Sequence, residues 1–251
     1  MQKPDLSAIL ITRDAALQLP DCLKTIDFCA EIVVVDNGST DSTVSIAKDF
    51  GCKVIQTTEW PGFGVQKQRA LDQAESSWIL SIDADERVSQ ELRDEIALAI
   101  QSHHFQGYFI NRKTQFLGRW MMHGGWHPDY VLRLARRDSC YFDPAPVHEK
   151  LIVRGSTSKL SGQLLHFSYA DVDDVLSKQR RYALAGAEKI RALRGSSASI
   201  FVALLRAFWA FSRSFFFRLG FLDGRQGLLA ALAKSQEVFW KYVAIEFQTK
   251  D

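Results

Sequence analysis

The chain has 251 residues, of which 47% are hydrophobic and 24% are charged, and its formal net charge is +2. This length and apolar content allow one large domain, or one domain with an appendage, around a substantial core. The four cysteines show neither a CxxC motif nor zinc-site spacing, which excludes a zinc module and favours a reducing compartment. The N-terminus shows no apolar region of a signal peptide, so we expect a cytoplasmic protein.

Strand and helix signals alternate through the first hundred residues. Short apolar, β-branched runs predict strands, and capping residues such as Asp14 and Ser89 predict the helices that follow them. This alternation predicts an α/β fold with a doubly wound, mostly parallel sheet and flanking helices. The expected strands cover residues 6–11, 31–35, 53–56 and 78–82, and the expected helices run over 14–26, from 39–41 to 50, over 65–74 and from 89 to about 101.

Acidic residues follow three of these strands: Asp14 the first, Asp36 the second, and Asp83 and Asp85 the fourth. Because the carboxyl ends of parallel strands meet at one edge, we expect them to form a rim that suits ribose hydroxyls, a base and a metal-bound pyrophosphate. Two carboxylates at the end of a buried strand need a positive partner. Carboxylate oxygens suit Mg²⁺ or Mn²⁺. The alternative is that Asp83 only caps a turn or a helix.

The sequence lacks the glycine-rich loops that bind phosphates. No G-x-G-x-x-G follows the first strand, and no G-x-x-x-x-G-K-[ST] occurs anywhere in the chain. The phosphates of a bound nucleotide therefore need another positive partner, which favours a metal ion held by Asp85.

The pattern changes near residue 107. A strand is expected at 107–111, followed by an irregular, aromatic segment at 112–150 of the kind that forms functional loops or lids. Strand-like pieces at 151–153 and 164–167 and a helix from 171 to about 194 come next.

Seven short motifs in this chain resemble those of one enzyme family. They are Ile11-Thr12-Arg13-Asp14, Val35-Asp36-Asn37-Gly38-Ser39-Thr40-Asp41, Ile82-Asp83-Ala84-Asp85-Glu86, Trp126-His127-Pro128-Asp129-Tyr130 with Arg133-Leu134, Val147-His148-Glu149, His166-Phe167-Ser168-Tyr169 and Gly220-Phe221-Leu222-Asp223-Gly224. The first three resemble family 2 glycosyltransferases, inverting enzymes of the GT-A fold that use a nucleotide sugar. The others resemble the lipopolysaccharide-core β-glucosyltransferase branch. The resemblance covers nearly the whole chain and is weaker in its C-terminal part.

The resemblance implies a GT-A catalytic domain at residues 1–168 and a helical C-terminal region at 169–251. In the first, Thr12, Arg13 and Asp14 would lie along the nucleotide, and Asp36 would contact its uracil or ribose.

The resemblance also implies roles for the Asp-x-Asp motif. Asp83, with Ala84 beside it, would bind the ribose or a metal-bound water, and Asp85 would hold the Mg²⁺ or Mn²⁺ that bridges the two phosphates. His166 is expected either close to this metal and pyrophosphate or in a structural role.

Basic residues are expected beside the donor. Many relatives carry Arg-Asn on the helix before the Asp-x-Asp strand, whereas this chain has Lys67-Gln68-Arg69, so Lys67 and Arg69 are both candidates. Arg133 is expected either to bind a donor phosphate or to pair with Asp129.

Inverting transfer requires a base that deprotonates the acceptor hydroxyl. Many relatives place it in Glu-Asp, whereas the candidate here is Glu149 in His-Glu-Lys, with Asp129 as its rival. We expect His148 to orient the base, to contact the acceptor or to be a core histidine. Trp126 either stacks on a sugar ring or belongs to the core.

The segment 199–222 is very apolar but contains three arginines. No run in it reaches the ~18 uncharged residues of a spanning helix. On a helix, Ser199, Arg206, Arg213 and Gly220 would form one row and leave a wide aromatic face. Such a basic amphipathic helix suits peripheral docking on an anionic membrane. Packing on the catalytic core or on a second subunit is the alternative.

We therefore expect a cytoplasmic enzyme on the inner face of the bacterial inner membrane that moves a hexose from UDP-glucose to a lipid-linked saccharide such as a lipopolysaccharide core. The alternatives are a nucleotidyltransferase that makes nucleotide sugars and a non-catalytic membrane-associated relative. Nucleic-acid binding is not expected, because the basic residues gather near an apolar helix and not around a stacking platform.

Overall fold

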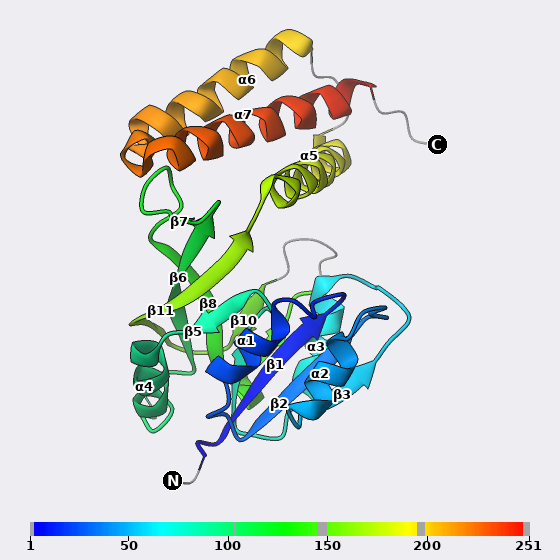
Figure 1. The fold of residues 1–251 in the computed structure, drawn as a ribbon, viewed down its shortest axis with the longest axis vertical. Helices are drawn as coiled ribbons and strands as arrows, with labels where there is room; N and C mark the ends of the chain where they lie inside the picture. The colour runs from blue at the N-terminus through cyan, green and yellow to red at the C-terminus, as the bar shows by residue number, and fades with distance from the viewer. Residues whose placement is uncertain (1–2, 103, 145–149, 195–198, 248–251) are drawn as a thin grey trace. The chain divides into compact units, whose positions relative to one another are not determined.

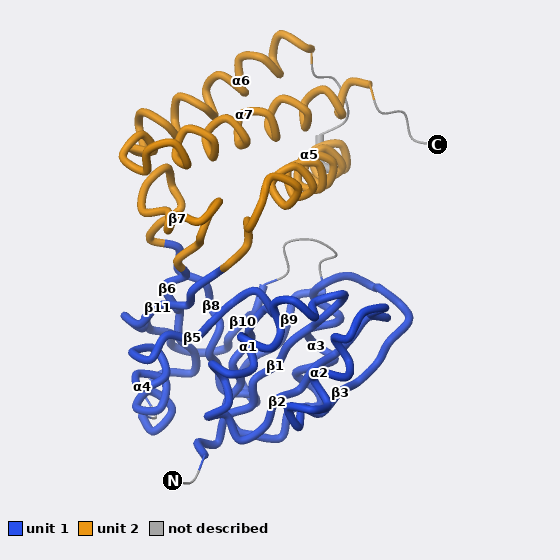
Figure 2. The backbone as a smooth tube through the Cα atoms, viewed as in Figure 1, with its two compact units in different colours: residues 1–112, 129–166 blue, residues 113–128, 167–251 orange. Residues whose placement is uncertain are grey.

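A computed structural model describes residues 3–102, 104–144, 150–194 and 199–247. The chain forms two compact units (Figures 1 and 2). Unit 1 comprises Met1–Arg112 and Asp129–His166, and unit 2 comprises Lys113–Pro128 and Phe167–Asp251. The functional division at residue 168 stays a prediction.

The first half of the unit 1 sheet is parallel, in the order β3-β2-β1-β4. Thr12 of β1 pairs with Asp36 of β2, and Ile9 of β1 pairs with Ser81 of β4, so the carboxyl ends of these strands meet at one edge. The predicted α/β class is confirmed (Figure 1). The strands are β1 (Leu6–Thr12), β2 (Glu31–Asp36), β3 (Lys53–Gln56) and β4 (Trp78–Ser81).

Helices cover both faces of these strands. In β1, Leu6, Ala8 and Leu10 belong to a core shared with α1 (Leu19–Thr25), α2 (Thr43–Asp49) and α4 (Gln90–Ala99). Ile9 belongs to a second core shared with α3 (Phe63–Asp72). A strand buried on both faces shows a continuous apolar run, which is why β1, β2 and β4 could be predicted.

The first helix begins later than predicted. Asp14 does not cap it, since its φ is +49° and α1 begins at Leu19. Pro20 in the first turn of α1 suits that start, because a proline there loses no helical hydrogen bond. The prediction for α4 is confirmed, because the Ser89 side chain accepts a hydrogen bond from the Leu92 N–H at 3.2 Å.

Most of the described part of segment 112–150 is regular, so the prediction of an irregular segment is wrong there. The strand β8 (Asp129–Arg136) lies between β4 and β6 (Gly107–Phe116) and is antiparallel to both. A buried arginine, Arg133, interrupts the apolar pattern of β8. The remaining strands are β5 (Glu86–Val88), β7 (Arg119–Trp120), β11 (Thr157–Tyr169) and the pair β9 (Cys140–Phe142) and β10 (Leu151–Val153).

Unit 2 contains three long helices, α5 (Val172–Arg194), α6 (Ile200–Ser212) and α7 (Gly224–Phe247). The helix α7 packs against both α5 and α6. The carboxylate of Asp223 is buried just before α7 and accepts hydrogen bonds from the backbone N–H groups of Met122 and His123 at 3.1 and 2.8 Å. This contact joins the segment 113–128 to the start of α7.

The prediction of one helix over 199–222 is wrong. The helix α6 ends at Ser212 and is followed by a π-helical turn, Arg213–Phe217, and a 3₁₀ turn, Gly220–Asp223. The backbone folds back so closely that a side chain on Gly220 would lie 2.7 Å from the Ser214 carbonyl oxygen. Gly220 is therefore not in a helical row with Arg206 and Arg213. By length and composition, Ile200–Phe217 meets the criteria for a membrane span, with 17% of it buried.

Candidate active site

Asp36 is fixed at the end of β2 by hydrogen bonds from both neighbouring loops. The Thr12 hydroxyl at the end of β1 donates to Asp36 Oδ2 at 3.0 Å, and the Ser39 N–H donates to Asp36 Oδ1 at 3.0 Å. Both carboxylate oxygens of this buried side chain thus have partners from the protein. The predicted meeting of the β1 and β2 ends is what the structure shows.

Asp14 joins the loops after β1 and β2. Its carboxylate accepts from the N–H and hydroxyl of Thr40 at 2.7 and 3.1 Å, while its own N–H donates to the Ser39 hydroxyl at 2.9 Å. The side chain is exposed and lies 3.9 Å from the Arg13 guanidinium. Arg13 and Asp14 therefore lie on the accessible side of this rim.

A buried amide that the sequence reasoning missed lies beside these loops. Gln66 of α3 donates from Nε2 to Asn37 Oδ1 at 2.9 Å and to the Thr57 hydroxyl at 2.8 Å. Arg69 donates to Gln66 Oε1 at 3.0 Å. Of the two basic candidates on α3, Arg69 thus supports this amide, whereas Lys67 reaches the Asp-x-Asp motif.

Asp83 is held between two cations at the end of β4. Its Oδ1 lies 3.1 Å from Lys67 Nζ, and its Oδ2 accepts from Arg133 at 2.6 Å. Burial raises the pKa of Asp83, but the positive charges of Arg133 and Lys67 outweigh burial and hold this pKa well below its usual range. Asp83 is therefore ionised at neutral pH, and its positive partners come from the protein.

Glu86 anchors the same cluster and was not predicted as a site residue. It is fully buried, and its carboxylate accepts from Arg133 at 2.7 Å and from the Asp83 N–H at 2.9 Å. Arg112 lies 3.6 Å away. The position of Glu86 directly after Asp-Ala-Asp did not predict its burial, because that burial depends on the distant strands β6 and β8.

Arg133 binds Asp83 and Glu86, and its predicted partner Asp129 pairs with Arg112 instead. The Oδ2 atom of Asp129 accepts from Nε and Nη2 of Arg112 at 2.9 and 2.7 Å. Asp83, after β4, and Asp129, at the start of β8, thus pair with different arginines.

Asp85 lies close to His166, the other residue predicted to hold the metal. Asp85 Oδ2 and His166 Nε2 are 3.3 Å apart, and both side chains are partly exposed. Ala84 between the two aspartates is partly buried against the core that contains Leu80 and Ile82. Within the described residues no group of three or more His, Cys, Asp and Glu side chains is arranged for a metal. Mg²⁺ and Mn²⁺ sites are often completed by substrate phosphates and water, so this pair fits such a site.

Two predicted residues, His148 and Glu149, lie outside the described residues. Trp126 belongs to unit 2, where its ring packs 5.6 Å from Phe116 and 5.5 Å from Tyr169, centroid to centroid. It also lines a pocket, so its predicted sugar contact stays open.

Comparison with known proteins gives a family match over more than half of the chain. Residues 7–149 match the family described as "Glycosyl transferase family 2". One relative is "Lipopolysaccharide core biosynthesis glycosyltransferase LpsC" of Rhizobium meliloti (strain 1021), which is 33% identical over 199 residues, covering 74% of this chain and 72% of the relative. Another is "Uncharacterized glycosyltransferase RP128" of Rickettsia prowazekii (strain Madrid E), 27% identical over 243 residues, covering 90% and 82%.

A solved structure shares the architecture. The structure of S. aureus TarS 1-349 in complex with UDP superposes with a TM-score of 0.51 and 18% sequence identity, covering 96% of this chain and 90% of the TarS chain. At this identity the likeness shows a common fold.

Proposed function

Since the chain belongs to glycosyl transferase family 2 and shares the GT-A fold, we propose that it transfers a hexose, glucose from UDP-glucose, to a lipid-linked saccharide such as a lipopolysaccharide core. The name of the R. meliloti relative supports the acceptor class. The UDP complex of TarS supports a uridine nucleotide as the leaving group.

The observation that carries this proposal is the cluster at the carboxyl end of β4. An ionised Asp83 is fixed by Lys67 and Arg133, and Asp85 of the same motif lies 3.3 Å from His166 of β11. The Thr12–Asp36 pair ends the two neighbouring strands. Ligands of open α/β sheets bind outside this edge, and these groups suit a nucleoside diphosphate there.

In the proposed donor complex, Asp36 and Thr12 hold the nucleoside, and Asp83 faces the ribose. Asp85 and His166 would hold Mg²⁺ or Mn²⁺, which supplies Lewis-acid stabilisation of the departing diphosphate. The Asp83 charge is neutralised by Lys67 and Arg133, so that it adds little repulsion to the phosphates.

The proposed transfer is one inverting displacement. The acceptor hydroxyl loses its proton to a carboxylate base, Glu149, as its oxygen forms a bond to the anomeric carbon. The bond from that carbon to the phosphate oxygen breaks, and the nucleoside diphosphate leaves with the electron pair. Asp129 remains the rival base, although its Oδ2 is engaged by Arg112.

The proposed acceptor class fits a membrane contact through α6. Phe201, Leu204, Leu205 and Phe208 recur at helical spacing and are 54–69% exposed. Exposed basic residues on α5, such as Arg180 and Arg181, add attraction to anionic lipid. We propose that this face docks on the cytoplasmic surface of the inner membrane. If the face instead joins two copies of the chain, this assignment is wrong.

Thermal unfolding with nucleotide sugars, with and without Mn²⁺, tests the donor site. UDP and UDP-glucose should raise Tm, and Mn²⁺ should increase the shift. Asp85→Asn should lose the Mn²⁺-dependent part of the Tm shift and keep the part caused by the nucleotide alone. Asp138→Asn, which removes an exposed acid of unit 1, should behave as the wild type. If no uridine nucleotide shifts Tm, the proposed function is wrong.

The two alternatives make different products. A nucleotidyltransferase would form UDP-glucose from a sugar phosphate and UTP, and a non-catalytic relative would release no UDP. Release of UDP from UDP-glucose in the presence of acceptor and Mn²⁺ separates both from the proposed activity.

A further inference from the structure

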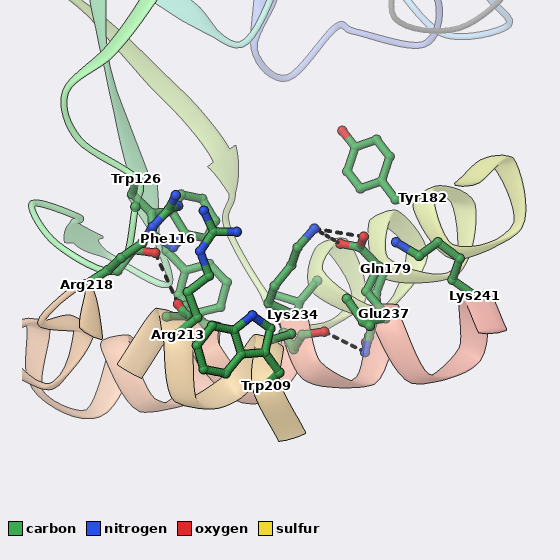
Figure 3. A pocket seen from close by; sticks show the side chains of 18 of the residues that line it. Phe116, Trp126, Gln179, Tyr182, Trp209, Arg213, Arg218, Lys234, Glu237 and Lys241 are labelled. Carbon is green, nitrogen blue, oxygen red and sulfur yellow. Dashed lines mark hydrogen bonds and ion pairs between the residues drawn. The ribbon is translucent and has the colours of Figure 1, made fainter. Parts of the chain in front are cut away.

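Unit 2 contains a cavity of about 500 Å³ that the donor site does not use. It is lined by α5, α6, α7 and the segment 113–128, all within unit 2 (Figure 3). Its volume is in the range of small-ligand sites. Six charged side chains lie in its wall among apolar and aromatic ones: Arg206, Arg213, Arg218, Lys234, Lys241 and Glu237.

Positive charge in this wall exceeds negative charge. The single lining carboxylate, Glu237, is bound by Lys234 at 2.8 and 2.9 Å. Within the described part of the chain, the other four cations have no carboxylate within ion-pair distance. Partial burial lowers the pKa of Lys241; Glu237 opposes this effect, and Lys234 and Arg206 add to it. An anionic ligand would relieve this repulsion.

Aromatic rings line the same cavity. Trp126 and Trp209 contribute indole rings, and Figure 3 shows the guanidinium groups of Arg213 and Arg218 on the side of Trp126. Gly125 leaves room for Arg218, because a side chain there would collide with the guanidinium group. Arginine binds phosphate oxygens through paired hydrogen bonds, and indole faces suit the apolar face of a sugar ring.

We propose that this cavity binds a phosphorylated saccharide. Resting on the proposed function, we assign that saccharide to the acceptor.

The geometry of α6 supports the acceptor assignment. Arg206, Trp209 and Ala210 of α6 line the cavity at helical spacing, and Arg213 joins them from the first position of the π-helical turn. At 100° per residue, this row lies on the opposite side of the helix from Phe201 and Phe208, which are 65% and 69% exposed. The helix thus separates a lipid-facing side from a side that binds sugar phosphate.

Calorimetric titration with three probes tests this proposal. They are the phosphorylated core oligosaccharide released from lipopolysaccharide by deacylation, the same oligosaccharide after phosphatase treatment, and glucose 6-phosphate. Removal of phosphate should weaken binding at least tenfold. Arg213→Gln/Arg218→Gln should weaken binding of the phosphorylated oligosaccharide by about 10- to 100-fold, because charge-assisted hydrogen bonds are lost. Arg225→Gln, which removes an exposed cation of α7 outside the cavity, should have no effect.

Two results would overturn the proposal. Equal affinity for the phosphorylated and dephosphorylated oligosaccharides would exclude phosphate recognition. Equal affinity for glucose 6-phosphate and the phosphorylated oligosaccharide would assign the cavity to free sugar phosphates instead of the acceptor. Circular dichroism and UDP titration of the same samples show whether the fold and the donor site are intact, so failure of this inference is separate from failure of the proposed function.

Discussion

In unit 1 the charges at the end of β4 neutralise one another, whereas four cations of the unit 2 cavity have no carboxylate within ion-pair distance among the described residues. Glu86, Arg133, Asp83 and Lys67 form a continuous chain of ion pairs around the end of β4. Arg213 and Arg218 line a cavity wide enough for a ligand. Buried charge that is satisfied internally fixes geometry, while charge without an internal partner favours an external anion.

The largest expected effect is on turnover in unit 1. Glu149→Gln should reduce UDP-glucose-dependent transfer by about 10²–10⁴-fold, because a positioned base contributes that much. The Tm shift with UDP should remain. Asp129→Asn is the matched variant: if it loses the larger share of turnover, Asp129 is the base and the assignment of Glu149 is wrong. Radiolabelled sugar transfer to deacylated core oligosaccharide measures both.

The buried ion cluster should matter next, through stability. Glu86→Ala leaves Arg133 with one fewer partner and should lower the free energy of unfolding by about 3–5 kcal/mol. Glu95→Ala, which removes a partly buried helix carboxylate that accepts from the Ser161 and Gly162 N–H groups, should cost less, because no buried charge is left unpaired. Urea denaturation followed by circular dichroism provides the comparison. Equal losses would show that the cluster does not hold the sheet edge.

The exposed apolar face of α6 gives a smaller effect. Phe201→Ser/Phe208→Ser should weaken binding to anionic phosphatidylglycerol vesicles by at least about tenfold, since each buried phenylalanine contributes roughly 1.5–3 kcal/mol. Leu98→Ser, at an equally exposed apolar site on α4 in unit 1, is the control and should bind as the wild type. If the wild type ignores vesicles and sediments as a dimer that the double variant disrupts, α6 is a subunit interface.

The smallest effect concerns acid. Because the folded-state pKa of Asp83 is lowered, its ionised form stabilises the fold above the unfolded pKa of about 3.9, and this contribution is lost as the pH falls through the folded value. The difference in unfolding free energy between the wild type and Asp83→Asn should therefore be largest near pH 7 and shrink below about pH 4. A constant difference down to pH 3 would contradict the role assigned to Lys67 and Arg133.

The parallel half of unit 1 was predictable because its signals are local. The strand 53–56 has the expected ends, the Ser89 cap forms, and the acids after β1, β2 and β4 follow strands whose ends meet. Each of these depends on residues within one strand or one turn. The Asp85–His166 pair came from family resemblance and not from spacing.

The antiparallel half was not predictable from local patterns. Strand β8 carries Arg133 inward, which breaks its apolar run, and the burial of Glu86 depends on Arg133, 47 residues away along the chain. The close packing of α7 on the 3₁₀ turn depends on Gly227, where a side chain would collide with the backbone of Gly220. Such long-range contacts leave no periodic trace in the sequence.

The two sides of α6 have one more consequence. An α-helix with its side chains is about 10–12 Å across, and the headgroup layer of one leaflet is roughly 5–8 Å thick. If Phe201 and Phe208 enter a bilayer, a phosphate group bound by Arg213 would lie about one helix width above them, just beyond the headgroups. The width of the helix would then set the distance between the membrane and the binding cavity. The cavity would bind the sugars of a glycolipid just outside the headgroups while its acyl chains remain in the bilayer.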